Sequence, residues 1–105
     1  MINKEEILKL QRNIDGVNTL SLLQKDFLKL VLWAHKNYGF YNFNLESVEN
    51  KYVKLKDDFN VSNEIQELID SDILTVDTKK TIFKGDYRTI KEMKITSSFL
   101  NSIND

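Results

Sequence analysis

The stretch Val61–Thr96 reads VSNEIQELIDSDILTVDTKKTIFKGDYRTIKEMKIT, and its charge changes sign near the middle. Residues 61–78 contain five acidic side chains and no basic one, whereas residues 79–96 contain six basic side chains and two acidic ones. The first half has the spacing of an amphipathic helix that runs into a strand, and the second half has the pattern of a β-hairpin. This order of elements predicts a small domain of the α+β class.

The acidic half predicts a helix followed by a strand. Ser62 is the expected N-cap of the helix, and Ile65, Leu68 and Ile69 recur behind it at helical spacing. The run Ile73–Val76 is rich in β-branched residues, which favour a strand. The outward positions of the helix are all polar, namely Asn63, Glu64, Gln66, Glu67 and Asp70.

The basic half predicts the hairpin. Tyr87–Thr96 is expected as its second strand, in which Ile90 has the opposite parity to Met93, as a bulge would produce. Asp77–Asp86 would then form a wing between the strands, and Gly85-Asp86 supplies residues suited to its turn.

Upstream of this stretch, a long apolar helix is the most strongly indicated element. Ser21 and Gln24 have the spacing of a capping box, and Gly39 stands where a C′ residue ends a helix. A helix with so little polar surface is normally the central, buried one, so we also expect Trp33 in the core. The apolar positions are Leu22, Leu23, Phe27, Leu28, Leu30, Val31, Leu32, Trp33, Ala34 and Tyr38.

Three shorter helices are expected around this central one. The first begins at Asn3, which is a good N-cap. The second begins at Asn44 after the short aromatic connector Phe40–Phe43, and it continues to Leu55. The last is capped by Ser97 or by the next residue, also a serine.

The composition limits the class of protein. A chain of 105 residues can bury one core but not two. The longest apolar run, Leu30–Ala34, is far shorter than the roughly 20 residues that span a bilayer. The absence of cysteine rules out disulfides and thiolate metal sites. We therefore expect a cytoplasmic protein without a membrane partner. The frequent Asn and Lys residues are typical of AT-rich genomes, such as those of low-GC bacteria, their phages and their plasmids.

No residue pattern points to catalysis, a cofactor or a metal. His35 is the only histidine, and no Ser or Asp stands at a spacing that would form a catalytic set with it. It is better explained as a helix-end residue favoured by the dipole or as a residue packed at the edge of the core. The three glycines are too scattered to cradle a phosphate. We expect a protein that is not an enzyme.

The order of long apolar helix, second helix, capped helix, strand and basic hairpin resembles the winged-helix superfamily across residues 19–103. Glu64–Leu74 looks like the end of a recognition helix that leads through a tight turn into the first wing strand, with Ser71-Asp72 where that family very often has a glycine. The resemblance implies a three-helix core with a β-hairpin wing, and it leaves residues 1–16 as an N-terminal accessory helix of one single domain. It also implies a DNA- or nucleoprotein-binding module without catalysis.

Under this resemblance, the leading hypothesis is a regulator or accessory factor of DNA transactions, carried by a phage or plasmid. The wing would contact phosphates of duplex DNA, and the third helix would face the major groove, where Asn and Gln can pair with adenine edges. The candidate residues are Lys79, Lys80, Lys84, Arg88, Asn63 and Gln66. The net charge of −1 is unusual for a dedicated nucleic-acid binder, so any basic surface must be local.

The second hypothesis is a protein-interaction module. Glu64, Glu67 and Asp70 would dock on a basic protein, for example a nucleic-acid-binding protein that this chain inhibits or recruits. The acidic residues of the helix and the basic residues of the wing also have structural explanations. A run of charges on a helix is often a solvated face, and exposed lysines keep edge strands from aggregating. A homodimer through the first helix would strengthen weak wing contacts by raising their effective concentration.

Overall fold

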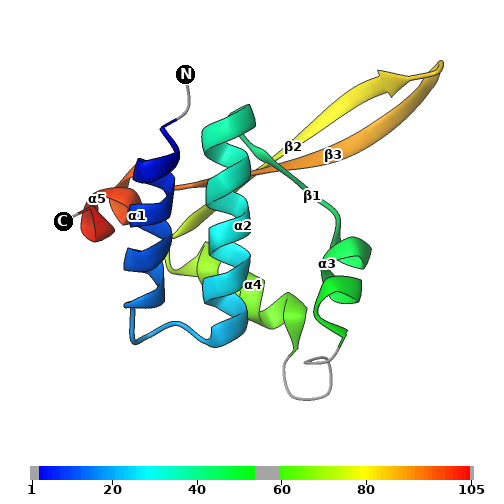
Figure 1. Ribbon diagram of the computed structural model, residues 1–105. Helices are drawn as coiled ribbons and strands as arrows, with labels where there is room; N and C mark the ends of the chain where they lie inside the picture. The colour runs from blue at the N-terminus through cyan, green and yellow to red at the C-terminus, as the bar shows by residue number, and fades with distance from the viewer. Residues whose placement is uncertain (1–2, 54–59, 105) are drawn as a thin grey trace.

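The computed structural model describes residues 3–53 and 60–104. In chain order its elements are α1 (Lys4–Asp15), α2 (Leu22–Tyr38), β1 (Tyr41–Phe43), α3 (Leu45–Lys51), α4 (Val61–Asp70), β2 (Leu74–Phe83), β3 (Asp86–Ile95) and α5 (Ser97–Ile103) (Figure 1). The strands form one antiparallel sheet in the order β1-β3-β2. The expected α+β class is therefore confirmed.

Helix α2 is the central element, and both of its predicted ends are confirmed. At its start the Ser21 hydroxyl accepts the backbone N–H of Gln24 at 3.1 Å, while the Gln24 side chain accepts the backbone N–H of Ser21 at 3.0 Å. At its end Gly39 adopts the left-handed conformation, with φ of 89°. Phe27 is fully buried, as predicted, but Trp33 is 45% exposed. The expectation that Trp33 lies in the core is wrong, because its side of α2 faces outward beside α1.

Helix α1 is part of the same core as α2. Asn3 caps it by accepting the backbone N–H groups of the next turn, as predicted. Its buried residues Leu10 and Ile14 belong to the cluster that surrounds α2, and Figure 1 shows α1 lying beside both α2 and α5. Helix α5 is capped by Thr96, not by a serine, because the Thr96 hydroxyl accepts the backbone N–H of Phe99 at 3.2 Å.

The two helices that precede the hairpin begin at asparagines. Asn44 caps α3 as predicted, and the expected continuation of this helix enters residues 54–59, which lie outside the described part of the chain. Asn60 caps α4 by accepting the backbone N–H of Asn63 at 3.1 Å. The predicted cap at Ser62 is therefore wrong: Ser62 is already inside the first turn of α4.

The aromatic connector is the short strand β1. Tyr41 pairs with Met93 and Phe43 pairs with Lys91 of β3. Because side chains alternate along a strand, Tyr41 and Phe43 lie on the same face, and both rings meet the ring of Phe27 edge-on, with centroids 5.9 and 6.3 Å away. The connector thus becomes the third strand, and its aromatic residues pack the sheet onto α2.

Strands β2 and β3 form a long two-stranded ribbon, which extends beyond the helices (Figure 1). Their pairing runs without interruption from Leu74 opposite Ile95 to Phe83 opposite Asp86. The expected bulge is therefore absent from the ribbon, and Ile90 simply lies on the other face from Met93. Most of Asp77–Asp86, which was predicted as the loop of the wing, belongs to the strands β2 and β3.

The turn of the ribbon consists of two residues, Lys84 and Gly85. Both have positive φ, 51° and 82°, as a type I′ hairpin turn requires. The prediction of Gly85-Asp86 as the turn is wrong by one position, because Asp86 pairs with Phe83 as the first residue of β3.

Replacement of Gly85 by alanine should destabilise the tip of the ribbon by about 1 kcal/mol, because a Cβ is strained at positive φ. Hydrogen exchange of the strand amides beside the turn should accelerate roughly fivefold. Lys84→Gly is the matched control, and it should leave exchange unchanged or slower, because glycine relieves the same strain at Lys84. Equal acceleration in both variants would contradict the assigned turn.

Candidate nucleic-acid interface

Two acidic side chains of α4 are directed toward the N-terminus of α2. The Ser21 hydroxyl donates to Oε2 of Glu64 at 2.9 Å, and Nε2 of Gln24 donates to Oε2 of Glu67 at 3.1 Å. The positive end of the α2 dipole favours both carboxylates. The interpretation of this whole helix face as a solvated surface is therefore wrong for Glu64, which is half-buried against α2.

Apart from Glu67, whose carboxylate accepts a hydrogen bond from Gln24 but whose side chain is exposed, the outward face of α4 is mostly uncharged. Ser62, Asn63, Gln66 and Asp70 are exposed on it. The one carboxylate among them, that of Asp70, accepts the side-chain amide of Gln66 at 2.9 Å. This face therefore offers hydroxyl and amide groups that can both donate and accept hydrogen bonds.

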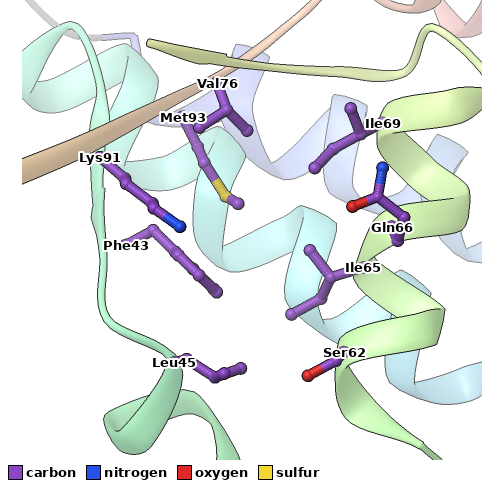
Figure 2. A pocket seen from close by; sticks show the side chains of 9 residues that line it. All are labelled: Phe43, Leu45, Ser62, Ile65, Gln66, Ile69, Val76, Lys91 and Met93. Carbon is purple, nitrogen blue, oxygen red and sulfur yellow. The ribbon is translucent and has the colours of Figure 1, made fainter. Parts of the chain in front are cut away.

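A groove of about 400 Å³ separates α4 from the sheet. Its floor is apolar, with Ile65 and Ile69 from α4 and Met93 from β3. Figure 2 shows Gln66 and Lys91 on opposite walls of this groove. The polar face of α4 and the amine of Lys91 thus border one concave surface.

Strand alternation separates the basic residues that were assigned to the wing. Lys80 has the same parity in β2 as Val76 and therefore lies on the groove side of the ribbon. Lys79 and Arg88 lie on the reverse side, and Lys84 lies in the turn. The four basic residues assigned to the wing therefore do not share one face, since neighbouring residues of a strand point to opposite faces.

Lys79 has a structural role on the reverse side. Its Nζ lies 3.3 Å from Oε2 of Glu92, and Glu92 is only 8% exposed. The cross-strand neighbour of Glu92 in β2 is Asp77, which is also acidic. A buried carboxylate needs a nearby cation, so Lys79 compensates a charge of the sheet.

Lys80 and Lys91 are the basic residues on the groove side of the ribbon. They are diagonal neighbours in the register, and both side chains are exposed. Within the described part of the chain, no carboxylate lies within ion-pair distance of either amine. We call the surface formed by Ser62, Asn63, Gln66, Lys80 and Lys91 the groove face.

Sequence reasoning missed Lys91 as a site residue, although a signal for it was present. Lys91 stands two positions before Met93, and Met93 and Ile95 are the alternating apolar residues of the predicted strand. The period of two along a strand therefore places Lys91 on the inward side, beside the third helix.

His35 closes one end of the sheet. Strand β1 begins at Tyr41, so the backbone N–H of Ile95 in β3 lies beyond the reach of a strand partner. That N–H donates to Nδ1 of His35 at 3.4 Å. Burial, followed by the charges of Lys36 and Lys94, lowers the pKa of His35. Of the two explanations given above, packing at the edge of the core is the one that the pKa direction supports.

Comparison of the chain with protein-family models, with curated proteins and with solved structures finds no match. Across residues 3–53 and 60–104, no three His, Asp or Glu side chains gather where they could hold a metal ion. Within the same ranges, none of the helices has both the length and the apolar character needed to cross a bilayer.

Glu64→Gln should lower the free energy of unfolding by about 1 kcal/mol, because it weakens the charge-assisted bond from Ser21 and the attraction to the α2 dipole. Asp70→Asn removes the same charge from the same helix and should change stability by less than about 0.5 kcal/mol. Urea unfolding followed by circular dichroism measures both. If neither variant loses stability, the carboxylate of Glu64 does not hold α4 to α2.

The protein should lose stability in mildly acidic solution because of His35. Its pKa is lowered in the folded state, so the stabilisation is complete above about pH 6.5 and decreases as the pH falls through the folded-state value. In His35→Gln a side-chain oxygen can accept the N–H of Ile95 without titrating. As the pH falls from about 8 to about 5.5, the wild type should therefore lose more unfolding free energy than the variant does. A difference that stays constant with pH would exclude this role.

Proposed function

We propose that this chain is a winged-helix domain that binds duplex DNA through the groove face, as a non-enzymatic regulator or accessory factor of DNA transactions. The order of elements that carried the resemblance has its counterpart in α2, α3, α4, β2 and β3. The proposal retains the expected cytoplasmic location and the phage or plasmid origin.

The backbone at the end of α4 supports the resemblance. Asp72 stands where the winged-helix family very often has a glycine, and its φ is 61°. Glycine is the usual residue at such a position, and aspartate is one of the few others that tolerate it. The Thr96 hydroxyl donates to the carbonyl oxygen of Asp72 at 2.7 Å and helps to hold this conformation. Asp72 thus adopts the left-handed backbone conformation for which the family very often uses glycine.

One observation carries the DNA-binding proposal: the exposed amide of Gln66 in α4 and the exposed amine of Lys91 in the ribbon line the same groove, with Asn63 and Lys80 farther out on the same two faces. Asn63 and Gln66 are residue types that read adenine edges in a major groove. Lys80 and Lys91 are suited to phosphates of the adjoining backbone. The carboxylates of Glu64 and Glu67 are directed toward α2, which reduces the repulsion that an acidic helix would exert on DNA.

The alternative protein-interaction module receives less support. It requires Glu64, Glu67 and Asp70 to be available to a basic partner. Two of these carboxylates accept hydrogen bonds from the start of α2, and the third accepts one from Gln66. A basic partner would share these carboxylates with the internal bonds, and a contact between Gln66 and DNA would likewise compete with the bond from Gln66 to Asp70.

Binding to a fluorescein-labelled random duplex, followed by anisotropy over a range of salt concentrations, tests the proposal. Few phosphate contacts imply weak binding at physiological salt and a shallow salt dependence. Lys80→Gln and Lys91→Gln should each weaken binding at low salt and reduce the slope of log K against log salt by about 1.

Lys94→Gln is the matched control, because Lys94 is exposed on the reverse side of the same ribbon. It should bind like the wild type. The proposal fails if the wild type shows no affinity at about 50 mM salt. It also fails if loss of Lys94 weakens binding as much as loss of Lys80 or Lys91, because binding would then follow total charge and not the groove face.

A further inference from the structure

Where α1 lies beside the second half of α2, three large apolar side chains are exposed. Leu8 is 57% exposed, Trp33 45% and Tyr38 68%. The rings of Trp33 and Tyr38 meet edge-on with their centroids 5.6 Å apart, so these side chains form a continuous surface. We call Leu8, Trp33 and Tyr38 the aromatic ridge. Aromatic side chains of this kind are enriched where protein surfaces meet.

Trp33 stands between two shallow apolar hollows. One, of about 400 Å³, lies between α1 and α2 and is lined by Ile7 and Leu8. The other, of about 470 Å³, lies on the far side of Trp33 and is lined by Leu30 and Phe40. A projection beside hollows on one surface has the shape needed for a twofold interface, because each copy can fill the hollow of the other.

The charges along α1 identify the partner as a second copy of this chain. Glu5, Leu8 and Arg12 are spaced three and four residues apart, so they lie along one side of the helix. When two such helices cross antiparallel at Leu8, Glu5 of each copy faces Arg12 of the other. The helix dipoles also oppose one another in this arrangement. Across the described ranges, no ion pair or hydrogen bond engages the side chain of Glu5 or of Arg12 within one copy.

We infer that a second copy of this chain covers the aromatic ridge and forms a twofold homodimer through α1 and α2. The ridge gives the interface its apolar centre, and the two Glu5–Arg12 pairs fix the antiparallel orientation. The inference does not depend on DNA binding. If both hold, each dimer presents two groove faces, and weak contacts add through effective concentration.

Sedimentation velocity of the full chain over a range of concentrations tests the dimer by charge exchange. The wild type should sediment as a dimer at high concentration. Arg12→Glu and Glu5→Arg should each raise the dimer dissociation constant about tenfold, because each places like charges opposite one another at two points of the interface. The double variant, which exchanges the two charges, should restore the dimer.

A control variant and a second measurement test whether the effects belong to the proposed interface. Lys94→Glu, a charge reversal on the sheet, should leave the dimer intact. Trp33 is the only tryptophan, so its emission should shift to shorter wavelength as the wild type is concentrated. Leu8→Ala should abolish that shift without changing the circular dichroism spectrum.

A wild type that remains monomeric at every concentration overturns the inference. A double variant that is as monomeric as the single ones also overturns it, because the two charges would then not face one another. Lys80→Gln and Lys91→Gln leave this surface unchanged, so failure of DNA binding and failure of the dimer appear in different variants.

Discussion

The fold depends on one buried amide. Gln24 is only 5% exposed, and its side chain forms hydrogen bonds in two directions. Its oxygen accepts the backbone N–H of Ser21 and completes the start of α2, while its nitrogen donates to the carbonyl oxygen of Glu64 and to the carboxylate of Glu67 in α4. A buried amide is stable only when such bonds are all made. The side chain that begins the central helix therefore also fixes where the helix beside the groove lies.

This connection determines which side chains the groove face presents. The carboxylates of Glu64 and Glu67 accept hydrogen bonds from the start of α2, and the amides of Asn63 and Gln66 face outward. Strand alternation makes a similar division on the ribbon, where Lys79 neutralises buried Glu92 on the reverse side. Much of the charge that is prominent in the sequence thus serves the structure itself, and the groove face uses a small remainder.

The sequence was a good guide to several local interactions, although the caps at Asn60 and Thr96 and the turn at Lys84-Gly85 were each misplaced by one or two positions. The capping box at Ser21, the C′ residue Gly39 and the caps Asn3 and Asn44 were all predicted, because each depends on residues within a few positions. Strand β1 was missed because three residues carry little periodic signal, and their partners in β3 are some fifty positions away along the chain. The destinations of Glu64 and Lys79 were missed for the same reason: both bind residues on other elements.

The length of the ribbon has a consequence for how it can move. Strand β1 pairs with β3 only between residues 91 and 93, so in the described chain the outer part of the ribbon consists of two strands with open edges. Two strands alone are marginally stable in water. The outer ribbon therefore takes its stiffness from its root at Leu74 and Ile95, which are buried in the core. Any partner that grips the tip must also restrain its bending, and that loss of conformational entropy weakens the contact however favourable its charges are.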